Sequence, residues 1–209
     1  MAEERQAAKR TRMRGEERRE SILLSAKHVF ARSTYAEAST GELARESGVT
    51  EPILYKHFGS KKGLFLALLQ KLCKQTLALL QERIERRAEK SVLEALEHVV
   101  DDYYAIIKTD PEGQRILFQA VAESGDSDIA NSISNHNRAV YRLIHQLVER
   151  AQQEGYLDAA INLDAAAWGY MSTILATQYG LMLNLSSEIA RVRDEMSCIW
   201  LRGLRAHES

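Results

Sequence analysis

Proline, cysteine and glycine are scarce in this 209-residue chain, which has 2, 2 and 11 of them respectively. So few helix-breaking residues, beside abundant Ala, Leu, Glu and Arg, favour an all-α protein over a sheet or a turn-rich fold. The two cysteines, Cys73 and Cys198, form no CxxC pattern, so they predict neither a disulfide framework nor a zinc site. They indicate a reducing cytoplasm, in which each packs as an inert thiol.

The chain has little that would direct it to a membrane. No apolar run is expected to reach the length of a membrane span, and the charged N-terminal stretch has no signal-peptide core. With 27% charged residues and ordinary apolar content, the sequence predicts a soluble, ordered, cytoplasmic protein without a membrane partner.

Motifs that would indicate an enzyme are missing as well. The sequence contains no HExxH, GxSxG, Walker or GxGxxG pattern, so no catalytic residue and no cofactor is predicted. The nearest metal-like group is His98, Asp101 and Asp102, at positions i, i+3 and i+4 of one helical face. Such a group is far more often a solvated face than a metal site, and we predict no metal.

Charge is unevenly distributed along the chain, although the net charge is only −1. Residues 1–74 carry 15 Lys and Arg against 9 Asp and Glu, a net +6, and residues 75–209 carry 13 against 20, a net −7. A basic head on an acidic body is expected when only the head meets a polyanion. Chance scatter together with a disordered basic arm would give the same counts, so charge alone does not decide.

Helical patterns predict how the head is organised. Residues 1–14 show no apolar periodicity and are expected to form a flexible basic arm, followed by an amphipathic helix from Glu16 to about Arg32. Ser39 and Glu42 have the capping-box spacing of a short helix that must stop near Gly48. A third helix should start at Thr50 or Glu51, where Pro52 is tolerated in the first turn, and end at Phe58.

Helical periodicity continues to the end of the chain, with no alternating strand pattern. The predicted ranges are 61–88, 91–108, 111–123, 128–154, 163–184 and 187–205. About nine helices are therefore expected, three of them in the head.

The spacing of Ala44, Gly48 and Leu54 is that of a helix-turn-helix. Ala44 is small where the two helices cross, Gly48 can adopt the left-handed conformation of a tight turn, and Leu54 faces the first helix. The spacing alone is a weak signal, but within a basic three-helix head it becomes much stronger. The third helix then projects its other side chains outward and can enter a major groove.

The segment "ILLSAKHVFARSTYAEASTGELARESGVTEPILYKHFGSKKGLF" resembles the DNA-binding domain of the tetracycline-repressor (TetR) family of bacterial regulators. The resemblance covers residues 16–70 and is highly specific. It implies a helix-turn-helix domain over 15–62, with the motif at about 39–58, and a helical ligand-binding and dimerisation domain over 63–209. The later helices match the family in number and length, not in motif.

The resemblance also implies roles for individual residues. Thr50, Glu51, Pro52 and Ile53 are expected to approach bases, whereas Tyr55, His57 and Lys61 mainly hold phosphates. Glu51 can instead stabilise the first turn of its helix, the role we favour. The predicted DNA-binding set is Ser39, Thr40, Thr50, Glu51, Pro52, Ile53, Tyr55, Lys56, His57 and Lys61. Lys61 and Lys62 stand in a first turn, where cations are unfavourable unless an anion such as DNA phosphate docks there.

Two further sets of residues are predicted in the body. The candidate pocket walls are Tyr103, Tyr104, Ile107, Phe118, Trp168, Met171, Gln178 and Tyr179, although each alone is more often plain core. Since one recognition helix reads few base pairs, a two-fold dimer on a near-palindromic operator is expected. Its predicted interface is Ala167, Tyr170, Ile174, Leu181, Val192, Met196, Ile199 and Trp200, unless these stripes belong to the monomer's own core.

The favoured function is a homodimeric, double-stranded-DNA-binding transcriptional regulator, usually a repressor in this family, released by a small apolar ligand. One alternative is a ligand-independent nucleoid-associated protein that acts through a protein partner. The other alternative is a helical enzyme or carrier, in which the basic head would have no role in the function.

Overall fold

The computed structural model describes residues 2–205, and within this range the chain forms nine α-helices and no β-strand. The all-α class predicted from the scarcity of proline and glycine is therefore confirmed. The helices are α1 (Ala2–Arg32), α2 (Thr40–Glu46), α3 (Glu51–Phe58), α4 (Lys61–Ala88), α5 (Val92–Lys108), α6 (Pro111–Ala122), α7 (Ser127–Gln153), α8 (Leu163–Met182) and α9 (Ser186–Leu204).

Helix starts follow the capping residues of the sequence. The Oγ of Ser39 accepts from the Glu42 N–H at 3.1 Å, and the Oγ of Ser60 accepts from the Gly63 N–H at 2.9 Å. The main difference from the sequence prediction is α1, which begins at Ala2 where a flexible arm was expected. Ala, Glu, Gln, Lys and Arg, which dominate residues 2–14, are strong helix formers and need no apolar stripe to form a helix.

The chain divides into two compact units, and neither is a single stretch of sequence. Unit 1 contains the chain up to Leu72 together with Glu112–Ile133, and unit 2 contains Cys73–Pro111 and the chain from Ser134 onward. The predicted division at residues 62 and 63 differs from this, because it assigned α6 and the start of α7 to the body.

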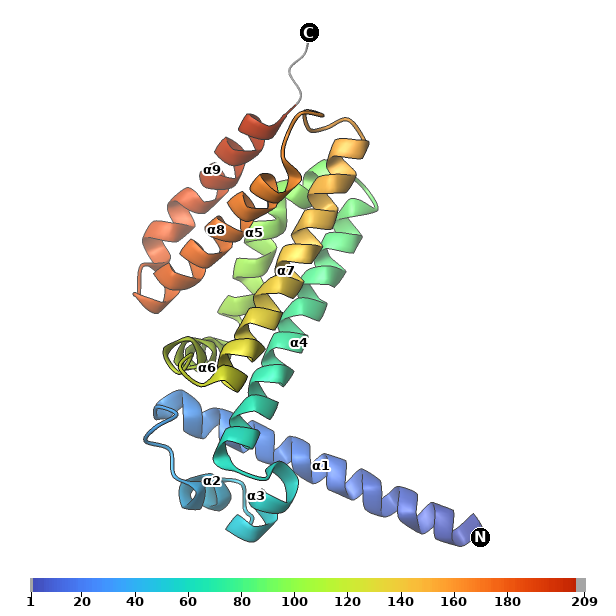
Figure 1. Cartoon of the computed structure of the whole chain (residues 1–209), viewed down its shortest axis with the longest axis vertical. Helices are drawn as coiled ribbons and strands as arrows, with labels where there is room; N and C mark the ends of the chain where they lie inside the picture. Colours follow the sequence, from blue (N-terminus) through green and yellow to red (C-terminus); the bar gives the residue numbers. More distant parts are fainter. Residues whose placement is uncertain (1, 206–209) are drawn as a thin grey trace. The chain divides into compact units, whose positions relative to one another are not determined.

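Unit 1 is built on the apolar stripe of α1. Ile22, Leu23, Ala26, Val29 and Phe30 are buried there, and α2 and α3 add Leu43 and Leu54 to the same core. Phe65 of α4 meets Phe30 edge to face, with ring centroids 5.1 Å apart. This core fixes the orientation of α2 and α3 against α1 (Figure 1).

Polar contacts attach α6 to the end of α1 within unit 1. Gln119 Nε2 donates to the carbonyl oxygens of Phe30 at 2.7 Å and Ser33 at 3.0 Å, near the C-terminus of α1. His28 and Glu112 add a contact of 2.9 Å between the same two helices. The segment Glu112–Ile133 is therefore held to the head by hydrogen bonds as well as by packing.

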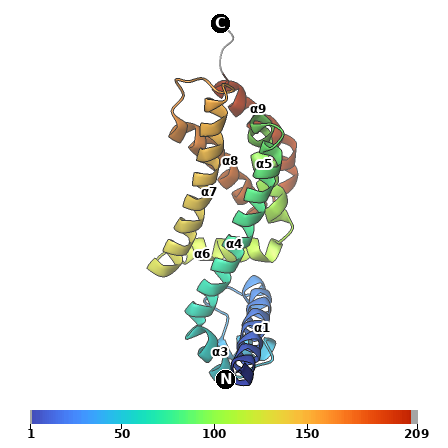
Figure 2. The same cartoon turned by 90° about the vertical axis from the view of Figure 1, so that its right-hand side faces the viewer.

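Unit 2 packs α5 against α8 and α9 (Figures 1 and 2). Its core includes Val99, Tyr103, Ile144, Tyr170 and Leu201, all nearly inaccessible to solvent. At Gly169 of α8, an added Cβ would lie 2.0 Å from the ring of Trp200 in α9. A glycine at this position lets the indole lie directly on the backbone of α8.

By length and composition α4 alone, among the described residues, could cross a membrane, contrary to the expectation that no such run exists. The core helix of a soluble protein satisfies the same criteria. Leu64, Phe65 and Leu68 of α4 are buried in unit 1, and Leu80 and Ile84 are buried in unit 2. Core packing uses part of the apolar surface of this helix, since 39% of its apolar window is buried.

Candidate DNA-binding interface and ligand-binding unit

The turn between α2 and α3 has the predicted helix-turn-helix geometry. Gly48 has a φ of 62°, the left-handed conformation that favours glycine, and the Val49 N–H donates to the Ala44 carbonyl at 3.0 Å. Leu54 is fully buried, so the side of α3 that carries it faces the core of unit 1.

The opposite side of α3 is open to solvent. Thr50, Glu51, Pro52 and Lys56 are exposed, and 43% of Tyr55 is accessible, a large fraction for an aromatic side chain. Ile53 and His57 are half-buried at the edges of this face. The predicted outward residues therefore share one accessible surface, and their contacts with DNA stay a prediction.

Glu51 and Thr50 differ in how their polar groups are used. The Thr40 hydroxyl donates to Glu51 Oε2 at 2.7 Å, so this carboxylate links the first turns of α2 and α3. The Thr50 side chain makes no capping hydrogen bond, although Thr50 is the N-cap residue of α3. Of the two roles considered for Glu51, the contact with Thr40 supports the structural one.

The two lysines at the start of α4 have protein partners that the sequence did not reveal. Lys61 Nζ donates to the carbonyl oxygens of Tyr35 at 2.9 Å, Ala36 at 3.3 Å and Ala38 at 3.1 Å, and it lies 4.8 Å from the centroid of the Tyr35 ring. Because an ammonium has three N–H donors, all of them are used here. The predicted phosphate contact of Lys61 would require at least one of these bonds to break.

Lys62 lies between two carboxylates at the start of α7. Its Nζ is 2.7 Å from Asp128 and 3.1 Å from Asp126, and these hydrogen bonds raise the pKa of Lys62 above its usual value. The contact with Lys62 in turn lowers the pKa of the Asp126 carboxyl. Both lysines are therefore tolerated in a first turn because unit 1 supplies their acceptors, carbonyl oxygens for Lys61 and carboxylates for Lys62.

The candidate pocket residues do not all lie on one surface. Tyr103, Tyr104, Ile107 and Met171 are buried in unit 2, and Phe118 is half-buried in unit 1. Gln178 Nε2 donates to the Tyr103 hydroxyl at 2.5 Å, and burial raises the pKa of that hydroxyl. Trp168 and Tyr179 are 55% and 57% exposed, so they lie outside the buried cluster of the other candidates, and their role as pocket walls stays a prediction.

The predicted dimer-interface residues differ in exposure: three of those on α8 are buried in the core of unit 2, whereas three of those on α9 are exposed. Ala167, Tyr170 and Ile174 are at most 1% exposed and belong to the core of unit 2. The accessible apolar side chains of α8 are Trp168, Leu175, Tyr179 and Met182. On α9, Val192, Met196 and Ile199 are 48%, 41% and 60% exposed, whereas Trp200 is half-buried, as is Leu181 of α8. Because α8 is apolar around its whole circumference, its sequence does not show which face is buried.

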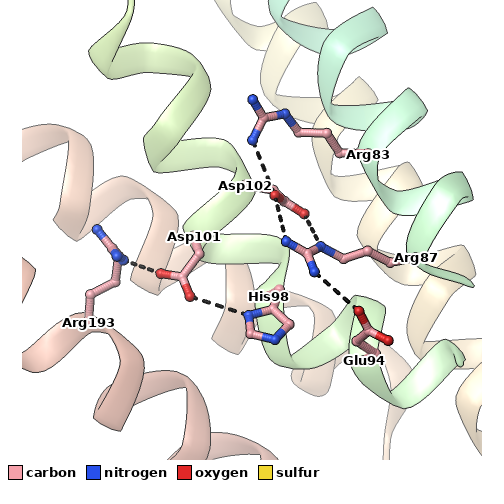
Figure 3. Close-up of polar contacts among 7 residues, drawn as sticks. All are labelled: Arg83, Arg87, Glu94, His98, Asp101, Asp102 and Arg193. Atoms are coloured by element: carbon pink, nitrogen blue, oxygen red, sulfur yellow. Dashed lines mark hydrogen bonds and ion pairs between the residues drawn. The ribbon is translucent and has the colours of Figure 1, made fainter.

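His98, Asp101 and Asp102 are not the solvated face that was expected. Asp102 is only 3% exposed and contacts Arg83 and Arg87, while Asp101 contacts Arg193 and lies 3.6 Å from His98 (Figure 3). The carboxylates are thus engaged by arginines, and within residues 2–205 no group of side chains has the arrangement of a metal site.

Comparison with known proteins identifies the head most clearly. The sequence model described as "Bacterial regulatory proteins, tetR family" matches residues 22–68. The chain is 31% identical over 108 residues to the HTH-type transcriptional activator FasR of Mycolicibacterium smegmatis, which covers 52% of this chain and 48% of FasR. The chain thus spans about half the length of that relative.

Other relatives match along most of the chain. Identity to the HTH-type transcriptional regulator UidR of Escherichia coli is 24% over 191 residues, or 90% of this chain and 89% of UidR. The crystal structure of the transcriptional regulator FadR from Bacillus subtilis in complex with stearoyl-CoA is similar with a TM-score of 0.75. That match covers 88% of this chain and 98% of FadR at 15% identity, so it shows the shared fold alone.

Proposed function

The chain belongs to the TetR family of bacterial regulatory proteins, and on this premise we propose that it is a ligand-released repressor that binds a near-palindromic operator as a two-fold dimer. The single observation that carries DNA recognition is the accessible face of α3. Tyr55 and Lys56 are exposed there, and the Thr50 hydroxyl is not used for capping. A helix presented this way fits a major groove.

Base and phosphate contacts are distinguished by how substitutions act on different sequences. Lys56→Gln removes a phosphate contact, so it should weaken binding to operator and unrelated DNA alike and reduce the salt dependence by about one counterion. Thr50→Val and Ile53→Ala should instead change which sequences are selected. Lys90→Gln, which removes the same charge from the exposed turn after α4, is the matched control.

The test starts from operators selected from genomic fragments by the full-length protein. Affinity should fall by about 10³–10⁵ between about 50 and 200 mM salt if each dimer contacts 6–10 phosphates. Salt-independent binding, or a Lys56→Gln variant that behaves like Lys90→Gln, would contradict this role for α3.

The exposed apolar surface of α8 and α9 supports a dimer. Four large apolar side chains of α8 and three of α9 are accessible in the single chain, and these two helices pack against each other. Packing of these helices across a two-fold axis would bury them in a four-helix bundle. Sedimentation should show a dimer that Ile199→Glu dissociates, whereas Leu24→Glu, at a comparably exposed site on α1, should leave it intact. A monomeric wild-type protein at micromolar concentration would rule out this interface.

For the ligand, the buried side chains of unit 2 support an apolar molecule. Tyr103, Ile107 and Met171 supply apolar surface, and the Gln178 amide beside the Tyr103 hydroxyl can orient a polar end group. A fatty acyl compound fits this chemistry, and the similar fold of FadR was solved with stearoyl-CoA. The proposed release acts through α4, which contributes residues to both units.

Linkage supplies the decisive measurement. Each acyl ligand is titrated into the free protein and into the protein–operator complex. If the ligand is an inducer, operator lowers its affinity, and the ligand lowers the affinity for operator by the same factor. Factors of about 5–150 are typical of such coupling. Equal affinities exclude that ligand as an inducer, and failure of a broad panel favours the ligand-independent alternative.

A further inference from the structure

A basic hollow of about 560 Å³ opens on unit 2, outside its apolar core. Side chains from α4, α5 and α9 line it: Arg83, Arg87, Asp101, Asp102, Tyr104, Ala105, Lys108, Thr109 and Arg193. Figure 3 shows the arginines from α4 and α9 approaching the two aspartates of α5 from opposite sides. None of these residues belongs to the DNA-binding head.

A buried carboxylate, a half-buried carboxylate and an aromatic ring hold the cations of this basic hollow in place. Asp102 accepts from Arg87 Nε at 2.7 Å, from Arg87 Nη2 at 3.2 Å and from Arg83 Nη1 at 3.2 Å. Arg193 pairs with Asp101 and lies 4.3 Å from the centroid of Tyr104, whose ring is 5.7 Å from Lys108 Nζ. A ligand would therefore meet guanidinium groups that are already oriented.

The lining has more positive than negative charge. It contains four cationic side chains, from Arg83, Arg87, Lys108 and Arg193, and two carboxylates, from Asp101 and Asp102, a formal excess of two positive charges within the lining. Glu94, outside the lining, shares Arg87 at 3.3 Å. Asp102 engages Arg83 through Nη1, so other N–H donors of this partly exposed guanidinium can still reach a ligand.

From this geometry we infer that the basic hollow binds a small molecule through a phosphate group, with Arg83, Lys108 and Arg193 as its ligands. A phosphate monoester carries about −1.5 to −2 charges at neutral pH, which matches the excess of the lining better than a carboxylate does. Guanidinium groups suit phosphate because their planar N–H forks pair with two oxygens at once. This site is separate from the buried side chains proposed for the apolar ligand, except that Tyr104 forms part of its lining.

The experiment is calorimetry of the full-length protein with inorganic pyrophosphate, inorganic phosphate and acetate at about 50 mM salt, where screening is moderate. Pyrophosphate should bind, phosphate more weakly, and acetate least. Lys108→Gln should weaken pyrophosphate binding about tenfold or more, the usual effect of losing one hydrogen bond to a charged group. Arg83→Gln should do the same, but it also disturbs Asp102, so Lys108 is the primary variant.

Two control variants show where the anion binds. Arg86→Gln removes a positive charge from an exposed position of α4 beside the lining and should leave the affinity within about twofold. Lys56→Gln tests the DNA-binding head, which can also attract phosphate. Binding that Lys56→Gln abolishes and Lys108→Gln spares would overturn the inference, and so would equal losses in Lys108→Gln and Arg86→Gln. Absence of pyrophosphate binding at about 10 mM would mean that the arginine–aspartate network is structural only.

Discussion

We expect His136 to make the stability of this protein sensitive to mild acid. Only 7% of this α7 residue is exposed, and its Nε2 has no hydrogen-bond partner among the described residues. Burial lowers the pKa of His136 from 6.5 to about 4, because an imidazolium would lose its hydration there. The folded protein thus keeps this ring neutral at pH values where the unfolded chain protonates it.

The sign and size of the effect follow from proton linkage. Between pH 6.5 and about pH 4 the unfolded chain binds a proton at His136 that the folded protein does not, so the free energy of unfolding falls as the pH falls. The complete loss is about 3 kcal/mol, of which about 2 kcal/mol is reached at pH 5. Above pH 6.5 the residue has almost no influence.

Equilibrium urea unfolding at pH 7.5 and pH 5 measures this loss when wild type is compared with His136→Leu. Leucine is apolar, similar in size and not ionisable, so the variant loses only the stability that other titrating groups control. Wild type should lose about 2 kcal/mol more than the variant over this interval. Parallel losses in the two proteins would refute the assignment of a neutral, buried imidazole.

Three further predictions concern stability. Gly169→Ala should lower the free energy of unfolding by about 1–3 kcal/mol, since the added Cβ would meet the Trp200 ring. Gly203→Ala is the control, because nothing lies within 4 Å of a Cβ there, and it should not destabilise the protein. The urea midpoints of both variants measure the difference. Asp102→Asn should lower the free energy of unfolding by about 2 kcal/mol. The loss is smaller than for a fully buried ion pair because the arginine partners of Asp102 are partly exposed. An unchanged urea midpoint would contradict this prediction. Ser39→Ala removes the N-cap of α2 and should cost about 1 kcal/mol, measured in the same way.

Local signals in the sequence sufficed for the helix-turn-helix and for most of the helices, although not for the first half of α1. Caps such as Ser39, the turn at Gly48 and the first-turn Pro52 act over a few residues, so each could be predicted without knowing the rest of the fold. The inward position of Leu54 followed from helical spacing in the same way. Each of these features is determined by residues close to it in the sequence.

Features that depend on distant partners could not be predicted. Lys61 donates to carbonyls of the loop between α1 and α2, and Lys62 contacts aspartates at positions 126 and 128, so neither partner is visible from the motif itself. The buried face of α8 could not be predicted because a helix that is apolar all round shows no preferred direction. Burial of Asp102 likewise depends on arginines of another helix, which helical spacing within α5 does not reveal.

The attachment of α6 to the head has a consequence for engineering chimeric regulators. A graft that exchanges only the stretch up to Leu72 would leave Gln119 facing a foreign helix end and Asp126 and Asp128 facing whatever replaces Lys62. Unit 1 of this protein is therefore not transferable as one continuous cassette. A functional exchange would have to carry Glu112–Ile133 along with the N-terminal segment, as a two-piece module with three splice points.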